Sequence, residues 1–284
     1  MQHNRRLATW TGAILGAFLA IMLNTALAHA RDDNGARVTE EFHHTYTLAA
    51  DGRVNLQNIN GAVHITAWDQ NEVKVDAVKR ADNDRELKNT EIRINASANS
   101  ISIETHYAKE DDWGGHHDFA SVEYTLMVPR RAKLDEVKLV NGSLDMDGVQ
   151  GEVRASCVNG PLSAKQLGGN AKLNTVNGPL EAKFERAAGE VELSSVNGSI
   201  DLTLPSDAKA SIEANTVSGG IDNNFGLHTD DHRFVGHSLR GELGGGGAEI
   251  RLNNVNGAID IHHAADGRAP SPAKDTREKQ EGTV

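Results

Sequence analysis

The 284-residue sequence has little cysteine, proline or aromatic content. Cys157 is the only cysteine, so no intramolecular disulfide can form and stability must come from burial and backbone pairing. Only six prolines occur against 28 glycines, and aromatic residues make up 4% of the chain. Trp68 and Trp113 are the only tryptophans beyond the first 30 residues, which leaves few of the stacking platforms that carbohydrate-active enzymes use.

Long apolar runs are also absent, except at the start of the chain. Arg5 and Arg6 precede an uncharged, apolar run over residues 7–27, and Ala28-His29-Ala30 follows it. This pattern predicts a secretory signal peptide, residues 1–30, cleaved after Ala30. The alternative is a membrane anchor, since the run is about long enough to span a bilayer, but polar residues dilute it. We therefore expect an exported protein, periplasmic or at the cell surface or secreted, with no membrane span after cleavage.

Positive charge is scarce. The formal net charge is −11, and removing residues 1–30 takes away two arginines and no acidic residue, which leaves −13. Phosphate binding requires a basic face, so nucleic acid is excluded as a partner. Cations and basic surfaces remain as partner classes.

A short unit recurs along the chain, and its corner is a Val-Asn-Gly tripeptide or a close variant. The first residues of the copies lie at 140, 158, 176, 196, 217 and 255, with an outlying copy at 59. The steps of 18 to 21 residues end in one of 38, which predicts a degenerate copy between 225 and 243. The corner residues are Asn60, Gly61, Asn141, Gly142, Asn159, Gly160, Asn177, Gly178, Asn197, Gly198, Ser218, Gly219, Asn256 and Gly257.

Apolar residues alternate with polar ones on both sides of each corner, so each copy reads as two short strands. Asn-Gly is a common hairpin turn, which would give an antiparallel meander. The copies also resemble one another at equivalent positions. Counted from the first residue of the corner, these are the positions three and five before it and four and six after it. In-register stacking of parallel strands rewards such identity, and this favours a β-solenoid.

The sequence thus predicts an all-β protein containing a right-handed parallel β-helix with repeats of about 18–21 residues. We expect a disordered amino terminus over 31–40, an irregular β cap over 41–136, the repetitive solenoid over 137–263 and a disordered tail over 264–284. The column before the corner holds Cys157, Thr175, Ser195 and Thr216, which reads as a crowded inner corner. Cys157 is then a packed core thiol.

These repeated units, with Leu204-Pro205 and the variant Val217-Ser218-Gly219-Gly220-Ile221-Asp222, resemble the bacterial putative-adhesin domain family, a domain of unknown function. The resemblance covers roughly residues 50–262. It implies an exported, envelope-associated β-solenoid and provides no catalytic residues.

Candidate chemical sites are few. One loop combines possible metal ligands at Asp111, Asp112, His116, His117 and Asp118, although a solvated acidic loop is the simpler explanation. A second candidate is an outward column five positions after the first residue of each corner, with Ser163 among acidic residues. Its carboxylates are Asp145, Glu181, Asp201, Asp222 and Asp260, which stacking would bring into a stripe that Ca²⁺ or a basic partner could bridge.

Three functional classes fit these patterns. The first is a non-catalytic, adhesin-like module of the cell envelope, which presents a repetitive β surface to a wall polymer, polysaccharide or protein and needs no cofactor. The second is a periplasmic component that senses or regulates envelope stress. The third, by fold analogy alone, is a carbohydrate-active enzyme. Export, the repeats and the lack of a convergent catalytic cluster in the sequence favour the first.

Overall fold

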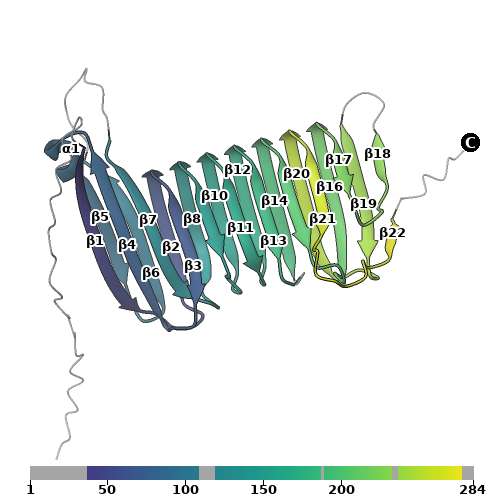
Figure 1. The fold of residues 1–284 in the computed structure, drawn as a ribbon, viewed down its shortest axis with the longest axis horizontal. Coiled ribbons are helices and arrows are strands. Elements are labelled where there is room, and N and C mark those ends of the chain that lie inside the picture. The colour runs from purple at the N-terminus through teal and green to yellow at the C-terminus, as the bar shows by residue number, and fades with distance from the viewer. Residues whose placement is uncertain (1–36, 109–118, 187–188, 232–235, 277–284) are drawn as a thin grey trace, which may run out of the picture.

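The computed structural model describes residues 37–108, 119–186, 189–231 and 236–276, which fold into two stacked β-sheets (Figure 1). The predicted signal peptide and the candidate metal ligands of residues 111–118 lie outside the described residues. The fold is all-β, as predicted. The one helix in the described part is α1 (Asp84–Lys88), whose N-cap residue Asn83 accepts hydrogen bonds from the backbone N–H groups of Arg85 and Glu86.

The ten-stranded sheet is named sheet A. Its strands, in spatial order, are β1 (Val38–Thr47), β4 (Glu72–Ala81), β7 (Ser121–Pro129), β3 (Val63–Trp68), β9 (Leu144–Asp147), β11 (Leu162–Leu167), β13 (Leu180–Phe184), β15 (Ile200–Leu204), β21 (Ile259–His263) and β17 (Ile221–Asn223).

The twelve-stranded sheet is named sheet B. Its strands, in spatial order, are β18 (Thr229–Asp231), β19 (His237–Leu243), β16 (Ala210–Ser218), β20 (Ala248–Asn256), β14 (Glu190–Asn197), β12 (Ala171–Asn177), β10 (Val153–Asn159), β8 (Lys133–Asn141), β2 (Arg53–Asn60), β6 (Ser100–Tyr107) and β5 (Thr90–Ala96); β22 (Ala273–Asp275) also pairs with β19.

Each central repeat sends one strand into sheet B, turns at its Asn-Gly corner and sends the next strand into sheet A. Neighbouring copies then pair in parallel, with Asn159 opposite Asn177 and Leu162 opposite Leu180. This pairing excludes the antiparallel meander and fits the predicted solenoid. The handedness of the winding stays a prediction.

Period-two alternation explains the core between the sheets. Leu173, Leu193 and Leu252 stack as fully buried neighbours in sheet B, and Leu180, Ile200 and Ile259 do so in sheet A. Burying one such side chain contributes about 1.5–3 kcal/mol, so the repeated apolar positions carry the stability of the stack.

The chain doubles back at both ends of the stack. The prediction of a cap over residues 41–136 is wrong for strands β2 and β3. These strands lie within the stack, between the β6–β7 and β8–β9 pairs. At the other end, β20 and β21 insert between the β14–β15 and β16–β17 pairs (Figure 1). The outlying corner at Asn60 therefore stacks directly on Asn141.

Other boundaries also differ from the prediction. The described residues between 225 and 243 contain no degenerate corner, because His237–Leu243 turns back as β19 and pairs antiparallel with β16. Residues 31–40 are predicted to be disordered, but strand β1 already begins at Val38. The predicted disordered tail is ordered as far as residue 276: Asp266 accepts a hydrogen bond from the backbone N–H of buried Ser206, and β22 pairs with β19.

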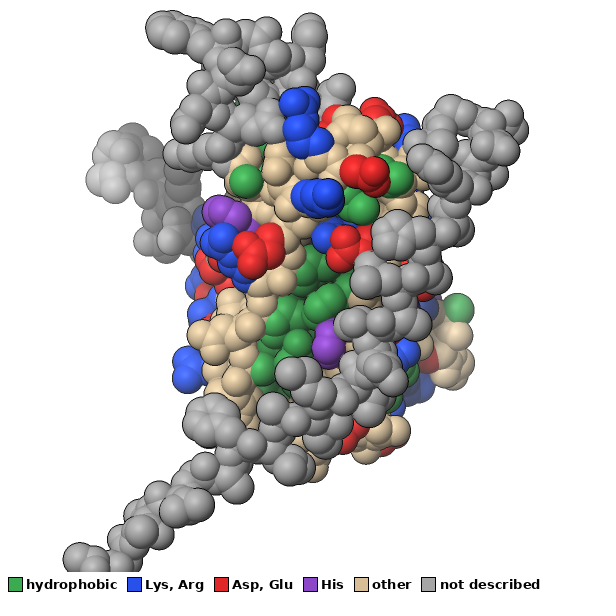
Figure 2. All heavy atoms as spheres, turned by 90° about the vertical axis from the view of Figure 1, so that its left-hand side faces the viewer, with side chains coloured by type: hydrophobic (Ala, Val, Ile, Leu, Met, Phe, Trp, Pro, Cys, Tyr) green, Lys and Arg blue, Asp and Glu red, His purple; other side chains and the backbone are tan. Residues whose placement is uncertain are grey.

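The two ends of the stack are closed differently. At the carboxyl-terminal end of sheet B, the short strands β18 and β22 both pair with β19. At the amino-terminal end a group of hydrophobic side chains is visible on the surface (Figure 2). Phe42, Tyr46, Ile92 and Ile94 pack against the core there but stay partly exposed.

Candidate functional site

The Asn-Gly corners form a continuous ladder of side-chain amides. Each Nδ2 donates to the Oδ1 of the Asn in the preceding coil, through Asn256, Asn197, Asn177, Asn159, Asn141 and Asn60, at 2.8–3.0 Å. All five bonds point the same way, so they can polarise one another. Ser218 replaces Asn at the last corner, opposite Asn256.

Glycine is required beside this ladder because successive corners approach closely. Gly178 has a φ of +150°, and its N–H donates to the carbonyl oxygen of Asn197 at 2.9 Å. A Cβ atom at Gly178 would overlap the carbonyl oxygen of Gly160. The column of corner residues is therefore structural, and it fixes the spacing of the side-chain rows on the outer faces of the sheets.

Next to the amides runs a row of exposed aliphatic side chains, the valine row. Its members follow one another across adjacent strands and are 37–53% exposed: Ile59, Val140, Val158, Val176, Val196, Val255 and Val217. Six steps of about 4.8 Å make the row about 29 Å long. Our sequence interpretation missed it, although the alternation that buries residue 157 turns residue 158 outward.

Two further rows share the outer face of sheet B with the valine row. The nearer one is uncharged and partly or fully exposed, and it runs Ser156, Asn174, Ser194, Asn253 and Asn215. The farther one is charged and runs Arg154, Lys172, Glu192, Arg251, Glu213 and Arg240.

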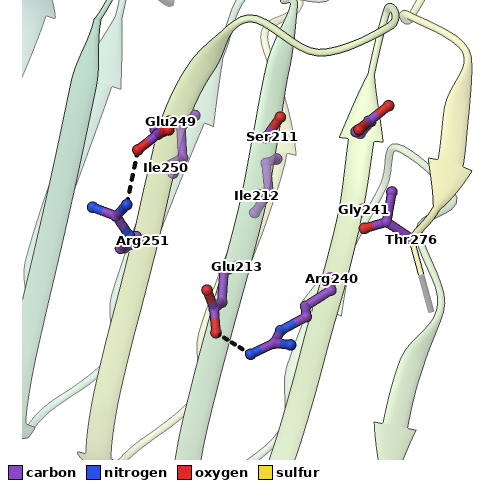
Figure 3. A pocket seen from close by; sticks show the side chains of 10 residues that line it. Ser211, Ile212, Glu213, Arg240, Gly241, Glu249, Ile250, Arg251 and Thr276 are labelled. Atoms are coloured by element: carbon purple, nitrogen blue, oxygen red, sulfur yellow. Dashed lines mark hydrogen bonds and ion pairs between the residues drawn. The ribbon is translucent and has the colours of Figure 1, made fainter. Parts of the chain in front are cut away.

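The charged side chains of this row are paired with opposite charges, either within the row or beside it. Glu213 accepts from Arg240 at 2.6 Å and Glu249 from Arg251 at 2.8 Å, around a shallow hollow of about 440 Å³ (Figure 3). A second hollow of about 220 Å³ lies by Arg154 and Lys172. These paired charges form a polar border beside the uncharged row and the valine row.

The predicted carboxylate stripe lies on the outer face of sheet A. The pairing order is Asp145, Ser163, Glu181, Asp201, Asp260 and Asp222, so Asp260 comes between Asp201 and Asp222. The last four of these positions form an unbroken run of carboxylates, which we call the carboxylate row. The sequence could not give this order because β21 inserts ahead of β17.

Electrostatics differ along the stripe. Burial raises the pKa of Asp201; His262 opposes this shift, while repulsion by Glu181 and Asp260 adds to it. Farther along, His64 Nδ1 lies 3.2 Å from Asp145 Oδ2, and Ser163 Oγ donates to Glu181 Oε2 at 2.9 Å. Within the described ranges, no group of three or more His, Cys, Asp or Glu side chains is arranged to hold a metal ion.

Cys157 is 1% exposed, and its Sγ donates to the carbonyl oxygen of Gly142 at 3.4 Å. Burial raises the pKa of its thiol. The predicted packed core thiol is therefore what the structure contains.

The fold thus defines an all-β repeat protein with two long, flat, regular faces. A family described as Toastrack DUF4097 matches residues 43–262, and the chain belongs to it. This match confirms the resemblance to a putative-adhesin domain of unknown function. No curated protein matches the chain.

Three solved structures are similar at low identity. A "putative cell adhesion protein" from Clostridium sporogenes is 14% identical with a TM-score of 0.49, over 79% of this chain and 100% of that one. A "putative adhesin" from Bacteroides fragilis is 14% identical with a TM-score of 0.29, over 79% and 97%. A "putative lipid binding protein" from Parabacteroides distasonis is 10% identical with a TM-score of 0.29, over 80% and 96%. Similarity at this level carries no argument about function.

Proposed function

We propose that the chain is a non-catalytic, exported binding module of the cell envelope, whose outer face of sheet B holds an extended polymer, in the first place an envelope polysaccharide. The observation that carries the proposal is the valine row, an exposed apolar line that runs in register across seven strands. Exposed apolar surface that is contiguous and bordered by polar residues is typical of interaction sites.

The chemistry of the three rows favours a sugar polymer. A sugar ring presents an apolar C–H face and hydroxyl edges. The valine row would contact the C–H face, while the amides and hydroxyls of the Ser/Asn row offer donors and acceptors to the hydroxyls. Both rows repeat at about 4.8 Å, so a chain of repeating units meets the same groups at each step.

Export and location belong to the same proposal. The predicted signal peptide supports secretion across the inner membrane, with the periplasm or cell surface as destination. In the part of the chain that the structure describes, no helix is long and apolar enough to span a bilayer.

Co-sedimentation of residues 31–284 with peptidoglycan, outer-envelope polysaccharide and intact cells tests the proposal. The informative variant changes Val176, Val196 and Val255 to Thr, which keeps β-branching and strand preference but removes apolar surface. We expect saturable binding to one polymer and about tenfold weaker binding by the triple variant.

A matched control lies on the same three coils, in sheet A. It changes Glu181 to Gln and Asp201 and Asp260 to Asn, and it should bind as the unmodified chain does. Loss of binding in the control alone would move the site to the carboxylate row. Saturable binding to none of the polymers, or release of soluble sugar from them, would contradict the proposal.

A further inference from the structure

The amino-terminal end of the stack has two strands at unpaired sheet edges. In the described residues β1 pairs only with β4, and β5 pairs only with β6. Both edges lie at the same end of the molecule, one in each sheet (Figure 1).

This end also exposes the interior between the sheets. Phe42, Tyr46, Ile92 and Ile94 face the core but are only partly covered. His44 lies among them, with its ring centroid 4.5 Å from that of Phe42. Figure 2 shows a hydrophobic area on this end of the molecule, with charged side chains above it. An edge with exposed core beside it is a site where another β-strand gains both hydrogen bonds and apolar burial.

Strand β1 lacks the usual devices that prevent edge pairing. Its ten residues contain no proline, lysine or arginine, and its register with β4 runs through ten pairs without a bulge. Glu40, on the face of β1 that includes Phe42, is an inward charge of the kind that protects edges. However, Lys79 neutralises it at 2.9 Å. A long and regular edge of this kind is expected to associate.

We propose that two copies of this chain associate through this end about a two-fold axis, with β1 antiparallel to β1 and β5 antiparallel to β5. The polar side chains of β1 are complementary to those of a second copy. Centring the pair on Phe42 sets Glu40 opposite His44 and Glu41 opposite His43 of the second copy, and it sets Val38 opposite Tyr46.

The edge of sheet B is self-complementary in the same way. Centring the β5 pair on Ile92 sets Glu91 opposite Arg93 of the second copy, twice. These two side chains already form an ion pair within one strand at 2.8 Å, and both are at least half-exposed. Opposite charges facing one another across an antiparallel pair favour that register, while like charges oppose it.

Association in this form extends both sheets across the axis. The outer face of sheet B then continues into that of the second copy, which doubles its length. The inference does not depend on the ligand of that face, because it rests on the strand edges and on the charges beside them.

Light scattering and analytical ultracentrifugation of residues 31–284 over a concentration series test the proposal. We expect a mass twice that of the monomer, and Glu91→Arg should weaken the dimer at least about tenfold, because two Arg–Arg pairs replace two Glu–Arg pairs. The double variant Glu91→Arg with Arg93→Glu keeps the net charge and reverses each pair, so it should restore the dimer. Unchanged far-ultraviolet circular dichroism spectra will show that the variants still fold.

Disulfide trapping tests the register. Only the central residue of a two-fold strand pair meets itself, at a Cα separation that a disulfide can bridge. Phe42→Cys should therefore crosslink two copies on oxidation, whereas Thr45→Cys, which faces Thr39, should not. Retention of an ordered fold by Phe42→Cys is checked by circular dichroism, and Ile92→Cys provides the same test on β5.

A monomer at all concentrations would overturn the proposal. So would a dimer that both Glu91→Arg and the crosslinking pattern leave unchanged, since it would use another surface. A dimer that forms only when residues 31–36 are also removed would assign the edge to the chain's own amino terminus and would likewise overturn it.

Discussion

Asn177 Nδ2 donates to Asn159 Oδ1 at 2.8 Å, although the two residues are 18 positions apart. Asn177 Oδ1 in turn accepts from Asn197 at 3.0 Å. An interior rung of the amide ladder therefore makes two side-chain hydrogen bonds, whereas Asn60 at its end makes one with another corner Asn.

Replacing Asn177 with Ala removes both hydrogen bonds. The groups left behind are exposed and can bind water, so we expect a loss of only about 1 kcal/mol in the free energy of unfolding, measured by urea denaturation. Asn60→Ala loses one ladder bond and should cost less. Equal costs at both positions would show that the ladder adds nothing beyond the single residue.

Gly178→Ala should be far more harmful. Its φ of +150° disfavours an L side chain, and the added Cβ would overlap the carbonyl oxygen of Gly160. We expect a loss of about 3 kcal/mol or more in the free energy of unfolding. Gly220→Ala is the control, because its Cβ would have only Asp222 Oδ2 within 4 Å, at 3.9 Å. A well-tolerated Gly178→Ala would contradict the close stacking of the corners.

Asp201→Asn should stabilise the protein at neutral pH. The pKa of Asp201 is raised in the folded state, by burial first and then by Glu181 and Asp260. The folded state therefore binds its proton more tightly than the unfolded chain does, and stability falls as pH rises from the unfolded pKa through the folded one. The gain from Asn should be less than about 1 kcal/mol, because solvent screens these partly exposed groups, and it should vanish at pH values below the unfolded pKa of Asp.

The measurement is the difference in melting temperature between the two proteins across pH, with Asp145→Asn as control because Asp145 has Ser163 and His64 as its neighbours in the sheet. A gain that grows on acidification would contradict this account. The same variants test calcium, which stays a prediction: a melting temperature that calcium raises, but not in Asp201→Asn, would show that the carboxylate row binds it.

The Cys157 thiol should be unreactive in the folded protein. Burial raises its pKa and leaves 1% of the residue exposed, so both the thiolate population and access are low. We expect a thiol reagent to label Cys157 only as the protein unfolds, with a rate that rises in denaturant. Rapid labelling of folded protein would mean that the corner opens locally.

Apolar periodicity and the matched columns gave the strands, the corners and the buried thiol correctly, because these depend on residues near one another in the chain. The sequence alone also placed Val158 on the outer side of its strand, although we did not draw that inference. The family resemblance followed from the same local units.

The tertiary structure alone decided which distant segments are neighbours. Chain order places Asp201 before Asp222, yet Asp260 lies between them, and Asn60 stacks on a residue 81 positions later. Parallel strands of similar pattern can pair in several orders at nearly equal local cost. The order is set where the chain turns back near each end of the stack, through the antiparallel strands β4 and β19, which lack the Asn-Gly corner. The order of residues along the two outer faces and the edge positions of β1 and β5 follow from these turns.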